Sequence, residues 1–186
     1  MEQLSEKQFK LTIRVLMIFS LIWIGISTIL PGGTNNPGIA APQAGFLAPE
    51  FTLNTLDGET MALADMRGKA VLVNIWASWC IPCRSEMPAM QAVYEEYASQ
   101  GFEVLAVNAT SQDSREDAAA FVAENGLTFP ILLDVDGFVG EKYQVSALPS
   151  SFFILPDGTI QEVVIGGPMA EALLRTRVDT LLEEVN

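Results

Sequence analysis

The two cysteines of this chain lie between an apolar run and a helical pattern, and that arrangement constrains the fold more than any other feature. Residues 70–78, AVLVNIWAS, are mostly apolar and rich in Val, Ile and Trp. Such a run is typical of a strand buried on both faces of a sheet. Cys80 and Cys83 follow at once, and apolar residues then recur at helical spacing over residues 82–99, ending before Gly101. We therefore expect a strand that passes directly into a helix at the cysteines.

The remaining pattern predicts an α/β fold, with a central mixed sheet flanked by helices. Apolar alternation on both sides of Asp57-Gly58 predicts a β-hairpin over residues 51–63. Further along, the expected elements are a strand at 102–110, a helix at 114–125, a strand at 129–134, a helical turn or two at 137–143, two strands within 150–166 and a helix at 169–184. We expect the last helix to bury one face, made of Leu173, Leu174, Val178, Leu181 and Leu182.

The N-terminal part of the chain predicts a membrane anchor. Residues 11–30 carry a single charge, Arg14, and a helix of about 20 mostly apolar residues is long enough to span a bilayer. Basic residues precede the apolar run, whereas residues 31–66 contain neither Lys nor Arg. By the positive-inside rule, residues 1–10 lie in the cytoplasm and the following domain lies on the periplasmic or extracellular side of a bacterial membrane.

A short Gly/Pro/Asn/Ala-rich stretch, residues 31–45, is interpreted as a linker, and residues 46–186 as one extracytoplasmic domain. A cleaved signal peptide is the alternative to an anchor, because the small residues GIAA at 38–41 resemble a cleavage site. That site lies about ten residues beyond the apolar run, which favours retention of the anchor.

Composition excludes several classes of function. The chain contains no histidine, which rules out Ser-His-Asp and Cys-His catalysis and His-ligated copper or iron, and two cysteines cannot complete a tetrahedral zinc site. The formal net charge is −13, so binding to nucleic acid is not expected. We expect no cofactor and no metal, and a monomer is the default assembly.

The position of the cysteines favours redox chemistry. A helix N-terminus stabilises a thiolate, so Cys80 is expected to be the attacking cysteine and Cys83, one turn later, to close the disulfide. Pro82 fits the first turn, where a missing N–H costs nothing. The alternative is a structural staple, but so short a loop constrains the unfolded chain little.

Three segments carry a resemblance to a known family. The motifs VLVNIWASWCIPCRSEMP, ALPSSFFILPDGTI and VVIGG resemble the thioredoxin superfamily, in particular its membrane-anchored TlpA/ResA-like branch. The likeness covers residues 48–182. It implies a thioredoxin fold with an N-terminal β-hairpin and a central helix-strand insertion between Phe102 and Tyr143.

The resemblance also implies roles for site residues. Cys80 matches the attacking cysteine, Cys83 the resolving cysteine, and Pro149 the cis-proline that faces them, where the backbone of Leu148 pairs with an extended substrate. An ordinary trans proline is the alternative, since few X-Pro bonds are cis. The docking surface is expected to comprise Trp79, Ile81, Pro82, Leu148 and Pro149. For Trp79, core packing is the alternative.

Glu86, three residues after Cys83, matches a buried acid of ResA-like proteins. Thioredoxin has an aspartate on the preceding strand where this chain has Asn74, so the proton acceptor for Cys83 must come from elsewhere. We expect a partly buried Glu86 with a raised pKa to fill this role. The alternative is a solvated helix carboxylate.

The resemblance implies a thiol-disulfide oxidoreductase that reduces the C-x-x-C of apocytochrome c during cytochrome c maturation, with electrons from a membrane transporter of the CcdA or DsbD kind. Three alternatives stay open. They are a disulfide-forming oxidase, a thiol peroxidase, because peroxiredoxins share the fold and an APEF opening, and a copper-handling protein of the Sco type. The last uses C-x-x-x-C with a distant histidine, which this chain lacks.

Overall fold

The strand that leads into the cysteines runs through the middle of a mixed sheet. The computed structural model describes residues 16–17, which are helical, and residues 39–183. The predicted anchor at 11–30 thus lies outside the described residues except for two positions. Within the described ranges, no helix combines the length and apolarity needed to cross a bilayer. The chain divides into two units, residues 1–35 and 36–186, and the fold described below belongs to the second.

The elements follow the predicted order with small differences at their ends. The strands are β1 (Thr52–Thr55), β2 (Thr60–Ala62), β3 (Ala70–Trp76), β4 (Phe102–Asn108), β5 (Ile131–Leu133), β6 (Ser150–Ile154) and β7 (Ile160–Ile165). The α-helices are α2 (Ile81–Tyr97), α3 (Arg115–Asn125), α4 (Phe138–Lys142) and α5 (Glu171–Leu182). Short 3-10 turns lie at Leu63–Met66, Ala98–Gln100 and Thr110–Gln112.

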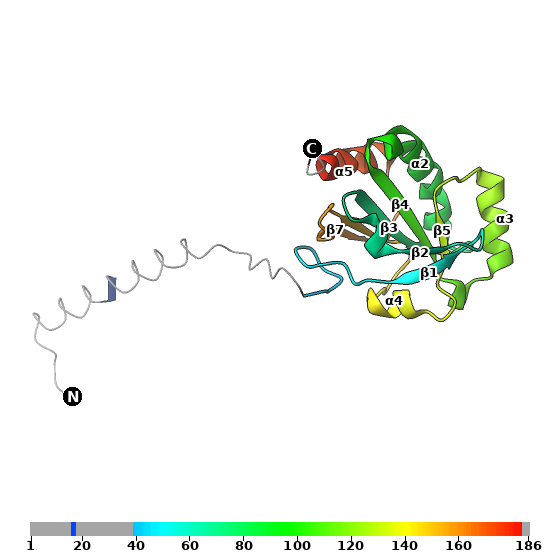
Figure 1. Ribbon diagram of the computed structural model, residues 1–186, viewed down its shortest axis with the longest axis horizontal. Helices are drawn as coiled ribbons and strands as arrows, with labels where there is room; N and C mark the ends of the chain where they lie inside the picture. The colour runs from blue at the N-terminus through cyan, green and yellow to red at the C-terminus, as the bar shows by residue number, and fades with distance from the viewer. Residues whose placement is uncertain (1–15, 18–38, 184–186) are drawn as a thin grey trace, which may run out of the picture. The chain divides into compact units, whose positions relative to one another are not determined.

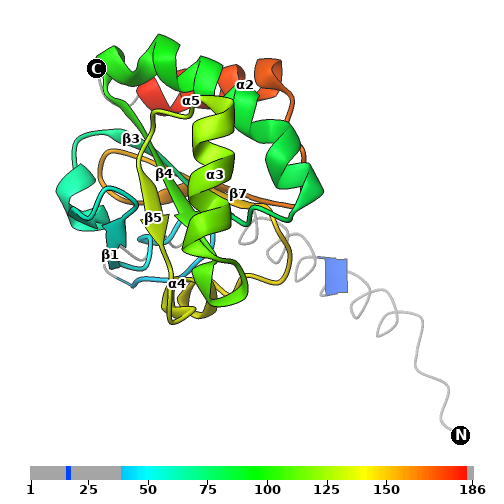
Figure 2. The ribbon, with the colours of Figure 1, turned by 90° about the vertical axis from the view of Figure 1, so that its right-hand side faces the viewer.

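The described strands form one mixed sheet in the order β2-β1-β5-β4-β3-β6-β7. Strands β3, β4 and β5 are parallel, and the other pairs are antiparallel. The hairpin β1–β2 forms one edge, and α3 with β5 makes the expected helix-strand insertion. Helices α2 and α5 lie on one face of the sheet and α4 lies on the other (Figures 1 and 2). The sheet flanked by helices confirms the fold class predicted from the pattern, and the arrangement is the thioredoxin fold that the resemblance implied.

Side chains alternate along β3, so they are divided between the two apolar clusters that cover the two faces of the sheet. Leu72 and Trp76 pack with α2 and α5, whereas Val73 and Ile75 pack on the α4 side. Because successive side chains point to opposite faces, Asn74 shares the face of Leu72 and Trp76. A polar side chain is thereby directed toward α2 in an otherwise apolar strand.

The domain begins earlier than the sequence suggested. Ala41 N–H donates to the Leu47 carbonyl and Gly45 N–H to the Ile160 carbonyl, at 3.0 and 2.8 Å. Residue Ala40 also forms an isolated bridge with Leu47. The C-terminal part of the expected linker, residues 39–45, is therefore fixed against β7 and belongs to the folded unit.

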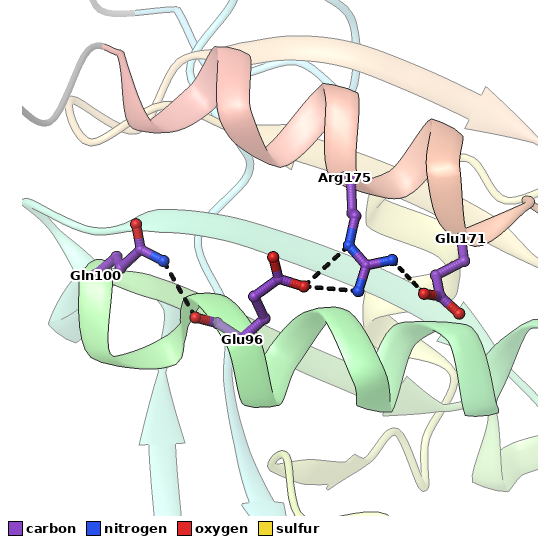
Figure 3. A network of polar contacts seen from close by, with 4 residues as sticks. All are labelled: Glu96, Gln100, Glu171 and Arg175. Atoms are coloured by element: carbon purple, nitrogen blue, oxygen red, sulfur yellow. Dashed lines mark hydrogen bonds and ion pairs between the residues drawn. The ribbon is translucent and has the colours of Figure 1, made fainter.

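Helix α5 packs against α2 through a mixed contact. The guanidinium of Arg175 donates to Glu96 Oε2 of α2 at 2.9 and 2.6 Å and also to Glu171 one turn earlier on α5 (Figure 3). Gln100 in turn donates to the Glu96 carbonyl. These groups are partly exposed, so the apolar face beneath them contributes most of the stability.

That apolar face differs from the prediction at one position. Leu174, Val178, Leu181 and Leu182 are buried, whereas Leu173 is 46% exposed. The buried residues follow i, i+4, i+7, i+8 spacing, and Leu173 is rotated by about 100° from Leu174, away from the centre of that face. The inclusion of Leu173 in the buried face was wrong.

Adjacent leucines in α5 provide a matched test of this packing. Leu174→Ala is expected to lower the free energy of unfolding by about 2–5 kcal/mol, because it removes buried methyl groups and leaves a cavity. Leu173→Ala, a change of the same chemistry on the exposed side, is expected to stay within about 0.5 kcal/mol of wild type. Urea unfolding measures both, and equal losses would contradict the observed orientation of the helix.

Candidate active site

The cysteines lie at the N-terminus of α2, where β3 ends. Cys80 is the N-cap residue, and its Sγ accepts a hydrogen bond from Cys83 N–H at 3.3 Å. Pro82 occupies the first turn of the helix, as expected. The two sulfurs form a disulfide with a Cα–Cα distance of 5.2 Å. Cys80 is 4% exposed and Cys83 is fully buried, so an incoming sulfur reaches Cys80 first.

A cleft of about 630 Å³ opens beside the disulfide. Its lining includes residues 79–82 and residues 145–148. Asp134 and, in or beside α4, Gly137, Gly140 and Glu141 also line it. Cys80 is thus among the residues that line the cleft.

The peptide bond between Leu148 and Pro149 is cis, as expected from the resemblance. Leu148 lines the cleft together with Cys80, and Pro149 itself is buried. Pro149 uses its carbonyl to accept a hydrogen bond from Gly166 N–H at 2.7 Å. The proline loop is thus fixed to the end of β7.

The residues on either side of Cys80 are open to solvent. Trp79 is 57% exposed and Ile81 is 77% exposed. The indole N–H of Trp79 donates to the Gln112 carbonyl at 2.9 Å, and both residues line the cleft. Of the two possibilities left open for Trp79, the exposed position fits a docking surface and excludes core packing.

Glu86 lies on the buried side of α2 and is more deeply buried than the sequence predicted. Its side chain has no solvent exposure. Oε1 accepts from Asn74 Nδ2 at 2.9 Å, and Oε2 accepts from Met169 N–H at 3.1 Å. Burial raises the pKa of Glu86, and the hydrogen bonds from Met169 and Asn74 only partly offset that rise.

Two residues near Asn74 and Glu86, namely Ser151 and Gly167, were missed by sequence reasoning. Asn74 also donates to Ser151 Oγ at 2.8 Å, directly across the β3–β6 pairing. Gly167 lies between the Glu86 carboxylate and Pro149, since a Cβ at Gly167 would stand 2.8 Å from both Glu86 Oε2 and Pro149 Cγ. A second cis bond, Gly167–Pro168, follows. The only signal in the sequence was the motif that ends in Gly166-Gly167.

In the described ranges, His, Cys, Asp and Glu side chains form no cluster of three that could hold a metal ion. The two sulfurs supply redox chemistry at this site, and the Glu86 carboxyl is a titratable group on its buried side.

Fold and site together define a thioredoxin-fold thiol-disulfide oxidoreductase, with a C-x-x-C pair at a helix N-terminus beside a cis-proline loop. Comparison with known proteins gives the family. Residues 44–163 match the model of the AhpC/TSA family, and the chain belongs to this family of thioredoxin-like proteins, within which its relatives include ResA-type thiol-disulfide oxidoreductases.

Two curated relatives and one solved structure illustrate the likeness. Thioredoxin-like protein YneN of Bacillus subtilis is 45% identical over 125 residues, covering 67% of this chain and 72% of that protein. The thiol-disulfide oxidoreductase ResA of Oceanobacillus iheyensis is 37% identical over 147 residues, covering 77% and 73%. A structure from Chlorobium tepidum described as a thiol:disulfide interchange protein DsbE superposes with a TM-score of 0.70 at 32% identity, covering 75% of this chain and 98% of that one.

Proposed function

We propose that this oxidoreductase acts as a reductant of protein disulfides outside the cytoplasm and is held at the membrane by residues 11–30. The C-x-x-C of apocytochrome c is the proposed substrate, and a membrane thiol transporter of the CcdA or DsbD kind is the proposed electron donor. The likeness to TlpA/ResA-like proteins supports the substrate and the donor. The charge pattern of residues 1–66 supports the orientation.

One electrostatic observation supports reduction over oxidation. Glu86 is buried one helical turn after Cys83, and of the described residues that line the cleft, Asp134 and Glu141 are acidic and none is basic. A strongly oxidising C-x-x-C pair has a stabilised reduced form. The described lining of the cleft supplies no side-chain cation to stabilise a thiolate, and the guanidinium of Arg84 is bonded to the Ser78 carbonyl. A dithiol whose thiolate is not stabilised in this way gives up its electrons more readily.

The proposed reaction is two successive exchanges. The Cys80 thiolate attacks one sulfur of the substrate disulfide, and the other substrate sulfur leaves as a thiolate. Cys83 then loses its proton to the Glu86 carboxylate and attacks Cys80 Sγ, which releases the second substrate thiolate. Two electrons pass to the substrate, and the enzyme is left with the Cys80–Cys83 disulfide.

The reduction potential tests the direction. The purified full-length chain in detergent is equilibrated with glutathione or dithiothreitol, and the free thiols are counted. We expect a value at or below about −220 mV, in the range of glutaredoxin and thioredoxin. A value near the roughly −120 mV of DsbA would contradict the proposal and favour a disulfide-forming oxidase.

The substrate is tested separately. Reduced full-length chain is mixed with oxidised apocytochrome c and with an unrelated protein that carries one exposed disulfide. Faster reduction of apocytochrome c supports the proposed substrate, and equal rates argue against it. Peroxide consumption by the same preparation, or tight binding of copper, would instead favour the peroxidase or the copper-handling alternative.

A further inference from the structure

Two loops meet at the cysteine end of the sheet. Strands β3 and β4 are parallel and paired along their whole length, with Trp76 opposite Asn108. Their carboxyl ends therefore lie at the same edge, and residues 77–80 after β3 face residues 109–114 after β4. The first loop carries Trp79 and Cys80, and the second leads into the insertion helix α3.

Asp113 in the second loop accepts four hydrogen bonds within the described part of the chain. Its Oδ2 accepts from Ser78 N–H at 2.6 Å and from Asn108 Nδ2 at 2.8 Å. Its Oδ1 accepts from Ser78 Oγ at 2.6 Å and from Ser114 N–H at 2.9 Å. Both oxygens are thus bound to Ser78, two residues before the attacking cysteine.

Three of these four bonds come from Ser78 and Asn108, and only the fourth comes from the N-cap residue of α3. Asp113 therefore does more than support the start of that helix. The N-cap of α3 is Ser114, whose Oγ accepts from Asp117 N–H at 3.0 Å. The α3 terminus is therefore capped without Asp113. Bonds from Ser78 and Asn108 instead join Asp113 to the ends of β3 and β4.

Neighbouring contacts act on the same loop. Ser78 donates two hydrogen bonds to Asp113, and its carbonyl oxygen accepts a third hydrogen bond, from the guanidinium of Arg84 at 3.1 Å. The indole N–H of Trp79 donates to the carbonyl of Gln112, the residue before Asp113. Two consecutive residues of the cysteine loop are thus bonded to two consecutive residues of the β4–α3 loop.

The carboxyl group of Asp113 is held in its charged form. Burial alone would raise its pKa, but the hydrogen bonds from Asn108, Ser78 and Ser114 together outweigh burial and leave the pKa below its ordinary value. The bonds are therefore charge-assisted at neutral pH, which makes them about twice as strong as neutral ones.

We infer that Asp113 is a positioning residue for thiol-disulfide exchange. It fixes the Ser78-Trp79 segment against the β4–α3 loop, and so sets where the indole of Trp79 and the sulfur of Cys80 meet the incoming substrate. This role concerns any protein disulfide and does not depend on apocytochrome c as the substrate.

The test compares three variants of the full-length chain. Asp113→Asn removes the charge and places an amide N–H group against donors. Ser78→Ala keeps the charge and removes the hydroxyl bond. Glu116→Gln is the control, because it makes the same charge change at an exposed position of α3. Thermal unfolding first establishes that each variant is folded.

Insulin, a generic protein disulfide, is the substrate, and hydrogen exchange of the Trp79 indole N–H is the second readout. Asp113→Asn is expected to lower kcat/KM about tenfold and Ser78→Ala about threefold, with Glu116→Gln within twofold of wild type. Indole exchange should accelerate in the first two variants only. If Asp113→Asn lowers the melting temperature but leaves both kcat/KM and indole exchange unchanged, Asp113 is a structural residue and the inference is wrong.

Discussion

Replacement of Cys80 by serine is expected to abolish thiol-disulfide exchange, with a fall in rate of more than about 10³-fold to the level of the buffer control. The reason is that Cys80 lines the cleft and is the one cysteine of the pair with any exposure, whereas Cys83 is fully buried. A serine hydroxyl in its place is not ionised at neutral pH and cannot attack a disulfide. Turbidity of reduced insulin measures the loss.

Cys83→Ser is the informative partner of that variant. It keeps the attacking sulfur and removes the resolving one, so the mixed disulfide between Cys80 and the substrate should accumulate with a stoichiometry near one. Non-reducing electrophoresis detects this adduct, which disappears with dithiothreitol. If Cys80→Ser traps substrate and Cys83→Ser does not, the roles of the two cysteines are reversed.

Glu86→Gln is expected to produce the second large effect. The glutamine keeps the shape of the side chain and can hold the bond with Asn74, but it accepts no proton from Cys83. Loss of a positioned acid or base costs about 10²-fold or more, and we expect that loss in the decay of the mixed disulfide, with the first attack by Cys80 less affected. Stopped-flow measurements from pH 5 to 9 separate the two steps.

The dependence of stability on pH should report the raised pKa of Glu86 independently of catalysis. The pKa of Glu86 in the folded chain lies above the ordinary 4.5, so the folded state favours the protonated carboxyl. The stabilisation is complete below about pH 4.5 and is lost as the pH rises through the folded pKa. The free energy of unfolding of the wild type should therefore fall relative to that of Glu86→Gln over this range.

Glu124→Gln is the control for both measurements, since Glu124 is exposed on α3. It should follow the wild type in exchange rate and in the dependence of stability on pH. Equal behaviour of Glu86→Gln and Glu124→Gln would remove Glu86 from the mechanism and leave the proton acceptor for Cys83 unassigned.

Local pattern was enough to predict most of the fold. The apolar run before Cys80 became β3, the helical spacing after it became α2, and the Asp57-Gly58 turn joined β1 to β2. These elements depend on residues a few positions apart, through alternation in strands and 3.6-residue spacing in helices. The chemistry of Cys80 and Cys83 was local in the same sense, because both sulfurs belong to one helical turn.

The tertiary structure decided the surroundings of that chemistry. The buried carboxyl of Glu86 finds its hydrogen-bond donors in distant segments, namely Asn74 on β3 and the backbone N–H of Met169, 83 residues later. Asp113 acts on Ser78 only because β3 and β4 end at the same edge of the sheet. No periodicity within a segment encodes which distant segment will lie against it.

The sequence by itself thus determined the order of elements and the identity of the redox pair. Which side chains are buried against each other was decided by packing. Leu173 and Leu174 are adjacent and chemically identical, yet Leu173 is exposed and Leu174 is buried. The reason is that packing of the whole core fixes which face of α5 points toward the sheet. The environment of Glu86 is set in the same way, since desolvation depends on every segment that excludes water from the carboxyl group.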